Sequence, residues 1–307
     1  MELTPDSCIN LMPELKGLDL DIQELKGGIT NKLYRVKSSD GGDYVFRIYG
    51  DKTNLFINRD VEVENLRRME PSGVTPRLIR YLPQQNTTVV EFIPGYVLNN
   101  EDFLKESLWE SILRPVRIIH RSGIKLPFVF HPLTEVKRFH GILEGVNSHS
   151  YPEFDIDGSV RTLEKITELC EPSDVRFVPC HNDLLADNFV LRQKSPKSTE
   201  PMVLIDWEYA GMGTPYYDIA DMFQEIGVPR KIERSLLEIY WDNKDVSYHE
   251  YMTDLLKPFP DIYWFLWSLI QLNISTLLFD YYSYGRVKYE NAQRNIGYCR
   301  EHYGTSI

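Results

Sequence analysis

Residues 181–188 read HNDLLADN, and residues 203–208 read VLIDWE. Asp183 and Asn188 are five positions apart in the first stretch, and Asp206 ends the apolar run of the second. Phosphoryl transfer to an alcohol requires a carboxylate that accepts the hydroxyl proton, and an amide oxygen and a second carboxylate that hold Mg²⁺ against the nucleotide phosphates. A single His-x-Asp is common, and a turn aspartate that caps a helix is its alternative interpretation. The three groups in this order and context favour phosphoryl transfer.

This spacing resembles the catalytic loop and metal-binding aspartate of the protein-kinase-like superfamily. The form of the motif is that of small-molecule kinases, because Asp206 directly follows an apolar strand and no Phe-Gly comes after it. The resemblance implies an α+β fold with two lobes, a small antiparallel-sheet lobe at the N-terminus and a mostly helical lobe at the C-terminus.

Composition bounds the function. The chain has 307 residues, of which 42% are hydrophobic and 26% charged, as in ordinary globular proteins. The net charge of −11 argues against a nucleic-acid-binding surface and is compatible with a small cationic substrate. The four cysteines form no Cys-x-x-Cys pair, so we expect neither a disulfide framework nor a zinc site, and a cytoplasmic location.

Two segments bear on membranes and secretion. The N-terminus carries acidic residues without a long apolar core and does not predict a secretory signal. The apolar stretch 262–279 is interrupted by polar residues, which predicts a buried amphipathic helix and no membrane span.

The pattern changes near residue 94. Residues 1–93 predict the β-rich, nucleotide-binding lobe, with strands at 32–37, 43–49, 77–82 and 87–93, a hairpin turn at 38–42 and a helix at 58–69. Pro94-Gly95 breaks the chain. Residues 94–307 predict the helical lobe, with helices at 101–122, 134–146, 160–171, 217–226, 232–241, 248–256, 262–279 and 289–302. Two short strands, 189–191 and 203–205, are joined by a polar loop at 193–201.

A closer resemblance is to the choline/ethanolamine kinase family, within the aminoglycoside-phosphotransferase-like group. The matching segments spread from residue 27 to about residue 284 and are GGITNKL (27–33), VFRIYG (45–50), HNDLLADN (181–188), LIDWEY (204–209) and WFLWSLIQ (264–271). The RIYG and Trp-x-x-Trp segments are specific to this family. The resemblance implies transfer of phosphate from ATP, with Mg²⁺, to the hydroxyl of choline or ethanolamine.

The resemblance also indicates where ATP binds in the first lobe. On the residues alone, Gly27-Gly28 is an ordinary β-turn, whereas the family's nucleotide loop matches Gly28, Thr30 and Asn31. Arg47 takes the strand position where most kinases have a phosphate-pairing lysine, and a guanidinium binds phosphate in bidentate fashion.

Three acidic or apolar residues complete the expected nucleotide site. Glu62 on the helix at 58–69 is the expected partner of Arg47, with Glu64 as the alternative and a solvated helix face as the simpler interpretation of both. Glu91 to Ile93 precede the break between the lobes, where main-chain groups would bind adenine.

For the chemistry, the resemblance assigns Asp183 as the group that orients the substrate hydroxyl and accepts its proton. Asn188 and Asp206 would ligate Mg²⁺, and Glu208 would add a direct or water-mediated contact or else face solvent. His181 is expected to be structural, because no second histidine stands at ligand spacing.

Aromatic residues are expected to form the substrate pocket. Trp264 and Trp267 are three positions apart and so share one helix face, which on the residues alone is more typical of a core. The family builds its amino-alcohol pocket from residues that match Tyr209, Trp264, Trp267, Phe279 and Tyr284. Ring faces attract a quaternary ammonium by about 1–2 kcal/mol each when desolvated.

The choice between choline and ethanolamine is left open. Leu185 stands where many choline kinases have Gln, and Phe279-Asp280-Tyr281 is closer to ethanolamine kinases, whereas residues 206–212 (DWEYAGM) resemble bacterial choline kinase-like proteins. Thiamine and aminoglycosides are alternative substrates, and a non-catalytic kinase-like binding module is the alternative of another class. A homodimer and the pathway, phospholipid metabolism or surface decoration, are left open too.

Overall fold

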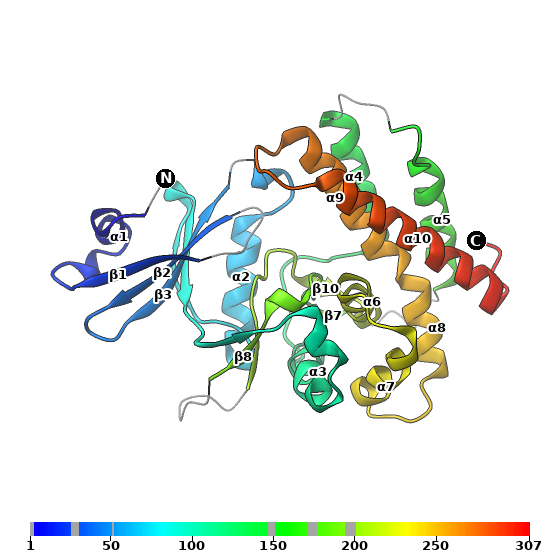
Figure 1. Cartoon of the computed structure of the whole chain (residues 1–307), viewed down its shortest axis with the longest axis horizontal. Helices are drawn as coiled ribbons and strands as arrows, with labels where there is room; N and C mark the ends of the chain where they lie inside the picture. Colours follow the sequence, from blue (N-terminus) through cyan, green and yellow to red (C-terminus); the bar gives the residue numbers. More distant parts are fainter. Residues whose placement is uncertain (1–2, 26–30, 51, 147–150, 171–176, 194–200) are drawn as a thin grey trace.

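The computed structural model describes residues 3–25, 31–50, 52–146, 151–170, 177–193 and 201–307 (Figure 1). Gly28 and Thr30, and most of the polar loop at 193–201, lie outside these described residues. An antiparallel sheet near the N-terminus is followed by a mostly helical region, which confirms the predicted α+β class.

The N-terminal sheet has five strands in the order β1-β2-β3-β5-β4, with all neighbours antiparallel. The predicted hairpin joins two of them, and Ser38 donates its backbone N–H to the carbonyl of Gly42 at 2.9 Å. The strands are β1 (Leu20–Leu25), β2 (Asn31–Ser38), β3 (Asp43–Tyr49), β4 (Leu78–Leu82) and β5 (Thr87–Glu91). The first strand was not predicted, because its run LDIQEL carries three charged or polar residues at the edge of the sheet.

Two helices pack on this sheet. The short α1 (Pro5–Leu11), which was not predicted, packs Cys8 and Leu11 against Phe46 of β3. Helix α2 (Arg59–Met69) begins at the cap residue Asn58 and buries Leu66 and Met69 in a core cluster shared with the helical region. Figure 1 shows α2 between the sheet and that region, so its polar residues can face both.

The helical region starts after the strand β6 (Gly95–Val97), which pairs with β8 (Phe189–Arg192), and β8 in turn pairs with β9 (Met202–Leu204). A second pair joins β7 (Val178–Cys180) to β10 (Gly211–Gly213). The helices are α3 (Glu106–Arg121), α4 (Pro132–Val146), α5 (Ile156–Leu169), α6 (Pro215–Ile226), α7 (Arg230–Trp241), α8 (Ser247–Leu256), α9 (Pro258–Ile274) and α10 (Tyr281–Tyr303). Within the described ranges, none of the helices has the length and hydropathy needed to span a bilayer.

Several predicted boundaries are wrong, and one matters for the site. The predicted helix 262–279 ends at Ile274, because Ser275 is extended (ψ 145°). Asp280 then caps a new helix by accepting the N–H of Ser283 at 3.0 Å, so α10 starts eight residues before the predicted 289. Phe279 therefore lies in the loop between α9 and α10, and Tyr284 lies on α10. The predicted helix at 101–122 likewise starts later, at Glu106, after the 3₁₀ turn Asn100–Leu104.

Candidate active site

A buried aspartate anchors the loop that carries Asp183. Asp218 of α6 accepts the backbone N–H groups of His181 at 2.9 Å and Asn182 at 2.6 Å. Asn182 has φ 64°, a left-handed conformation that asparagine tolerates better than most residues. Helix α6 therefore fixes this loop through its backbone, and His181 has the structural role expected of it.

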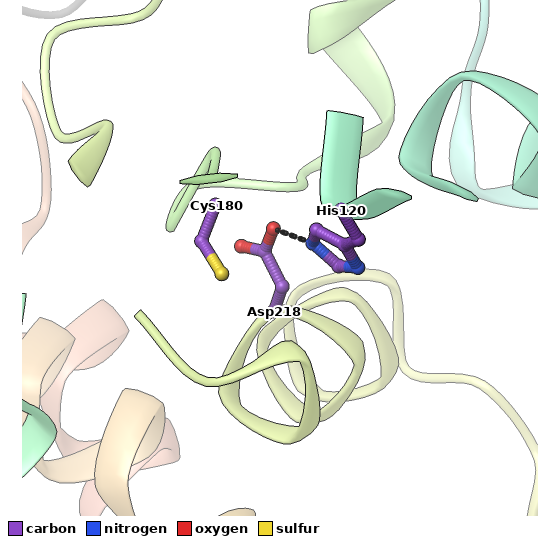
Figure 2. A group of neighbouring side chains, drawn as sticks. All are labelled: His120, Cys180 and Asp218. Carbon is purple, nitrogen blue, oxygen red and sulfur yellow. Dashed lines mark hydrogen bonds and ion pairs between the residues drawn. The ribbon is translucent and has the colours of Figure 1, made fainter. Parts of the chain in front are cut away.

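The same aspartate forms a buried group with His120 and Cys180 (Figure 2). Asp218 lies 2.8 Å from Nε2 of His120, and Nδ1 of that ring faces the hydroxyl of Tyr240. Burial raises the pKa of the Cys180 thiol well above its usual range, and a thiol binds metals poorly. Because both ring nitrogens and both carboxylate oxygens already have partners, we interpret this group as the anchor of the loop.

Asp183 itself is buried and lies beside Asn188. The side-chain amide of Asn188 donates to the backbone carbonyl of Asp183 at 2.8 Å and to its Oδ2 at 3.2 Å. Oδ1 of Asp183 has no partner among the described residues. Burial, and next the carboxylates of Asp221 and Asp206, raise the pKa of Asp183 well above its usual range. A positive charge placed beside Asp183 would lower this pKa and make the carboxylate a base.

Asn188 and Asp206 offer oxygen ligands of the kind that Mg²⁺ prefers. The amide nitrogen of Asn188 is used on Asp183, so its Oδ1 points away from that carboxylate. Asp206 follows β9 with φ 66° and a side chain that is 31% exposed. Its Oδ1 lies 2.6 Å from Arg47, and within the described residues its Oδ2 accepts no hydrogen bond. The role of these two side chains as magnesium ligands stays a prediction.

The predicted partner of Arg47 is found at Glu62. Nη1 of Arg47 donates to Oε1 of Glu62 at 2.8 Å, and both side chains are buried. Glu64, the alternative, lies on the exposed side of α2 and pairs with Arg68 at 2.7 Å. Arg47, on strand β3 of the sheet, therefore connects helix α2 to Asp206 in the segment after β9.

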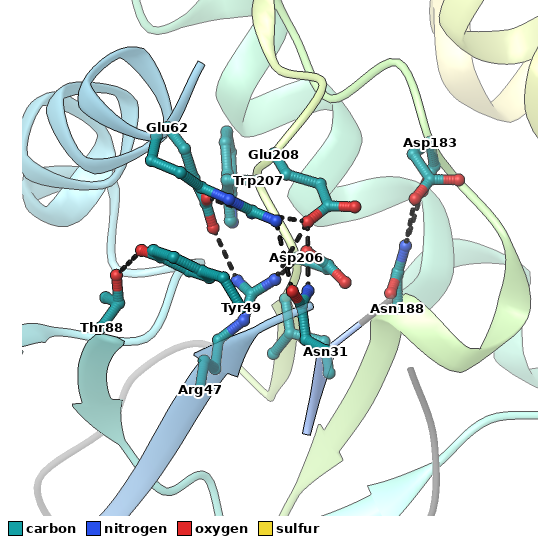
Figure 3. Close-up of polar contacts among 12 residues, drawn as sticks. Asn31, Arg47, Tyr49, Glu62, Thr88, Asp183, Asn188, Asp206, Trp207 and Glu208 are labelled. Atoms are coloured by element: carbon teal, nitrogen blue, oxygen red, sulfur yellow. Dashed lines mark hydrogen bonds and ion pairs between the residues drawn. The ribbon is translucent and has the colours of Figure 1, made fainter. Parts of the chain in front are cut away.

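Tyr49 (Figure 3) and Arg59 also belong to this cluster and were missed in the sequence. Arg59 lies over the ring of Tyr49 at 4.0 Å and donates to Glu62 at 2.7 Å and to Glu208 at 2.9 Å. The i,i+3 spacing of Arg59 and Glu62 is the sequence signal that was available for it. Burial, and next Asp206, raise the pKa of Glu208 to about 7 although the two arginines lower it.

Glu208 thus contacts the arginines rather than solvent. Its Oε2 accepts from Arg59, from Arg47 at 3.3 Å and from Asn31 at 3.4 Å, whereas Oε1 accepts no hydrogen bond within the described part of the chain. Asn31 of the expected nucleotide loop completes the cluster by accepting from Arg59 at 3.2 Å. A metal contact of Glu208 would have to use Oε1.

The residues expected near adenine lie at the junction of the two regions. Glu91 ends β5 and accepts the N–H of Arg77 at 3.4 Å. The side chain of Ile93 is buried with Val190 and Val203 of the small sheet β6-β8-β9. Their side chains therefore support the junction, and binding of adenine by the main chain here stays a prediction.

The predicted aromatic residues form a continuous series. The ring centroids of Tyr209 and Trp264 are 5.2 Å apart, and those of Trp264 and Trp267 are 6.1 Å apart. The Tyr284 ring lies 6.1 Å from Trp267 and 6.0 Å from Phe279. Tyr209, Trp264 and Trp267 are buried and Tyr284 is partly buried, whereas Phe279 is 39% exposed at the edge of the series.

Asp221 of α6 connects these rings to Asp183. One carboxylate oxygen accepts the backbone N–H of Leu184 at 2.7 Å, and the other accepts Nε1 of Trp264 at 2.9 Å. Sequence reasoning missed Asp221 and its neighbour Glu225, which raises the pKa of Asp183 and Asp221. Their spacing from Asp218, three and seven positions, places all three on one face of α6 and was the available signal.

Comparisons with known proteins agree with this geometry. A family model described as choline/ethanolamine kinase matches residues 22–251. Ethanolamine kinase 1 of Mus musculus is 28% identical over 314 residues, covering 91% of this chain and 85% of its own. Probable choline kinase 1 of Arabidopsis thaliana is 25% identical, covering 88% of this chain and 85% of its own. The crystal structure of choline kinase LicA from Streptococcus pneumoniae has the same fold, with a TM-score of 0.80 at 24% identity, covering 95% of this chain and 98% of that one.

Proposed function

This chain belongs to the choline/ethanolamine kinase family, and on that basis we propose that it transfers the γ-phosphoryl group of ATP to the hydroxyl of ethanolamine or choline. The observation that carries the proposal is that Asp183 is connected to the aromatic series on one side and to Asn188 on the other. Asp221 ties its loop to the aromatic series through Leu184 and Trp264. Asn188 donates to the Asp183 carboxylate from the side on which Asp206 and Arg47 lie (Figure 3).

Asp183 orients the acceptor hydroxyl and takes its proton as the phosphoryl group is transferred. In the ligand-free protein, burial and the neighbouring carboxylates raise the pKa of this carboxyl above its usual range. The ammonium of a bound acceptor supplies positive charge that lowers this pKa and favours the carboxylate, which is the form that accepts a proton. The acceptor thereby activates its own catalyst.

The nucleotide occupies the side of Asp183 that faces away from the aromatic series. Asn188 and Asp206 would hold Mg²⁺, with Oε1 of Glu208 as a further contact, and the bound ion would neutralise charge on the phosphates. Arg47, oriented by Glu62, binds phosphate oxygens. The main chain of Glu91 to Ile93 binds adenine, and Gly28, Thr30 and Asn31 belong to the phosphate loop.

The acceptor ammonium lies against Tyr209, Trp264, Trp267, Phe279 and Tyr284. Choline presents methyl groups to the ring faces, whereas ethanolamine also donates hydrogen bonds to a carboxylate. The nearby carboxyl groups of Asp221 and Glu225 would attract the positive charge of either choline or ethanolamine. We place this enzyme of phospholipid metabolism in the cytoplasm, where a reducing environment suits the free thiols of Cys8, Cys180 and Cys299.

The test is ADP release from ATP with choline, ethanolamine, thiamine and kanamycin as separate acceptors. We expect release with choline or ethanolamine and detection of the corresponding phosphate ester. Turnover with only thiamine or kanamycin would assign another substrate class to the same fold. No release with any amino alcohol would contradict the proposal and favour a non-catalytic binding module.

A further inference from the structure

An ammonium group of the protein itself is buried beside the aromatic series. Lys288 of α10 is 5% exposed, and its Nζ lies 2.5 Å from Oε1 of Glu225 and 3.5 Å from the carbonyl of Gln224. The same Nζ lies 5.6 Å from the ring centroid of Tyr284. Carboxylate and ring face are the two features that recognise an organic ammonium, so Lys288 already fills one such position.

Glu225 is shared between this lysine and the acceptor pocket. While Oε1 meets Lys288, Oε2 accepts the hydroxyl of Tyr284 at 3.5 Å, and Tyr284 is part of the aromatic series. Glu225 also acts electrostatically on Asp183 and Asp221. The carboxylate of Glu225 therefore lies between the ammonium of Lys288 and Tyr284, one of the rings proposed to contact the acceptor.

The surroundings of Lys288 are strongly acidic. Burial lowers its pKa, but Glu225 and Asp261 outweigh burial and the net pKa is raised, so the lysine is charged. Asp261 of α9 is fully buried and is bonded through Oδ2 to Asn295 at 3.2 Å. Without the lysine, the carboxylate of Glu225 would be left without its cation beside Tyr284, and this negative charge would attract a second cation.

We propose that Lys288 is a specificity-determining residue whose ammonium fills a second cation position of the acceptor pocket and so restricts the acceptor to one positive charge. This inference rests on the proposed function and deepens it, since it states why a monocationic amino alcohol is preferred over a dicationic one. Lys288 touches no reacting atom and acts through Glu225.

The test compares ethanolamine with diaminopropanol, an alcohol that carries two ammonium groups near neutral pH. ADP release is measured for the wild type, Lys288→Ala, Lys288→Arg and Arg286→Ala. Arg286 lies on the same helix, is 57% exposed and pairs with Glu290, so it controls for the loss of a surface cation. In Lys288→Ala the ratio of kcat/KM for the diamine to kcat/KM for ethanolamine should rise at least about tenfold. Lys288→Arg and Arg286→Ala should keep the wild-type ratio.

A second readout does not need turnover. Propylammonium chloride, relative to sodium chloride of equal ionic strength, should raise the Tm of Lys288→Ala more than that of the wild type, because the variant offers the vacated position in addition to the acceptor position. Equal stabilisation of both proteins would overturn the proposal, as would an unchanged substrate ratio in folded Lys288→Ala. If Lys288→Ala does not fold, Lys288→Met removes the charge at similar volume and gives the same ratio test. Failure of the wild type to release ADP with any amino alcohol would defeat the proposed function, and the propylammonium experiment would still decide the role of Lys288.

Discussion

Nη1 of Arg59 lies 2.9 Å from Oε2 of Glu208, so the first residue of α2 is bonded to the segment that follows β9. Their side chains are 11% and 6% exposed. This buried pair joins the sheet-bearing part of the chain to the part that carries the catalytic loop.

Arg59→Met should lower the free energy of unfolding by about 2 kcal/mol or more, because it leaves a buried carboxylate with one fewer cation. Chemical denaturation of the ligand-free protein measures this. Arg68→Met is the matched control, since Arg68 lies on the same helix in the exposed pair with Glu64 and should cost less than about 1 kcal/mol. Equal losses of unfolding free energy in both variants would show that the buried Arg59–Glu208 pair contributes no more to stability than the exposed Arg68–Glu64 pair.

Trp267→Ala should raise the KM for the amino alcohol at least about fivefold and leave the KM for ATP unchanged, because one ring face of about 1 kcal/mol is lost. Trp267 is the better choice over Trp264, whose indole nitrogen also holds Asp221. Trp241→Ala is the control, since this ring packs against His249, away from the aromatic series. A rise in the KM for ATP alone would assign the helix α9 to nucleotide-side or core structure.

Asn188→Ala and Asp206→Ala should each raise the Mg²⁺ concentration needed for half-maximal activity, since each removes an oxygen ligand from a site with few protein ligands. Asp187→Ala provides the control, because Asp187 adjoins Asn188 in the chain but is exposed. The measurement is a Mg²⁺ titration of activity at saturating ATP and acceptor. Unchanged titrations in both site variants would remove these two residues from the metal site.

Asp261 predicts a dependence of stability on pH. Burial raises its pKa to about 8 against the partly compensating charge of Lys288, from an ordinary value of 3.8. The folded protein therefore keeps a proton that the unfolded chain releases, and the stability from this group is present at low pH and is lost as the pH rises toward about 8. Glu225, Asn295 and Arg294 are the other groups that act on it.

Asp261→Asn keeps a neutral side chain at every pH. Its free energy of unfolding relative to the wild type should therefore increase between about pH 5 and about pH 8, by at most about 1.4 kcal/mol per pH unit. Asp187→Asn, at an exposed position, should show no such trend. A difference between Asp261→Asn and the wild type that is constant with pH would mean that Asp261 is ionised in the folded protein.

The parts of the fold with strong local patterns were predictable. Strand 43–49 was placed at its observed bounds, and the helix at 58–69 begins one residue after its cap, Asn58. The strands β6, β7 and β10 were missed because each has three residues and is held by pairing between distant segments, which leaves no local pattern. The loop at 275–280 was missed because its apolar residues continue the pattern of α9.

For the site, residue type and spacing identified Asp183, Asn188 and Asp206, since their order along the chain carries the chemistry. Arg59 and Asp221 were missed because their importance comes from contacts with residues 149 and 43 positions away. The helical spacing of Asp218, Asp221 and Glu225 was readable, but acidic residues on a helix face usually meet solvent, and only packing shows that these three are enclosed.

The central claim is that Asp183 accepts the proton of an alcohol whose ammonium lies on the adjoining aromatic series. The most direct test is the kcat of Asp183→Asn with ethanolamine and with choline, together with the dissociation constant for ADP. The account predicts a kcat at least about a hundredfold below that of the wild type and an unchanged dissociation constant. A kcat comparable to the wild type would remove Asp183 from the reaction and contradict the account.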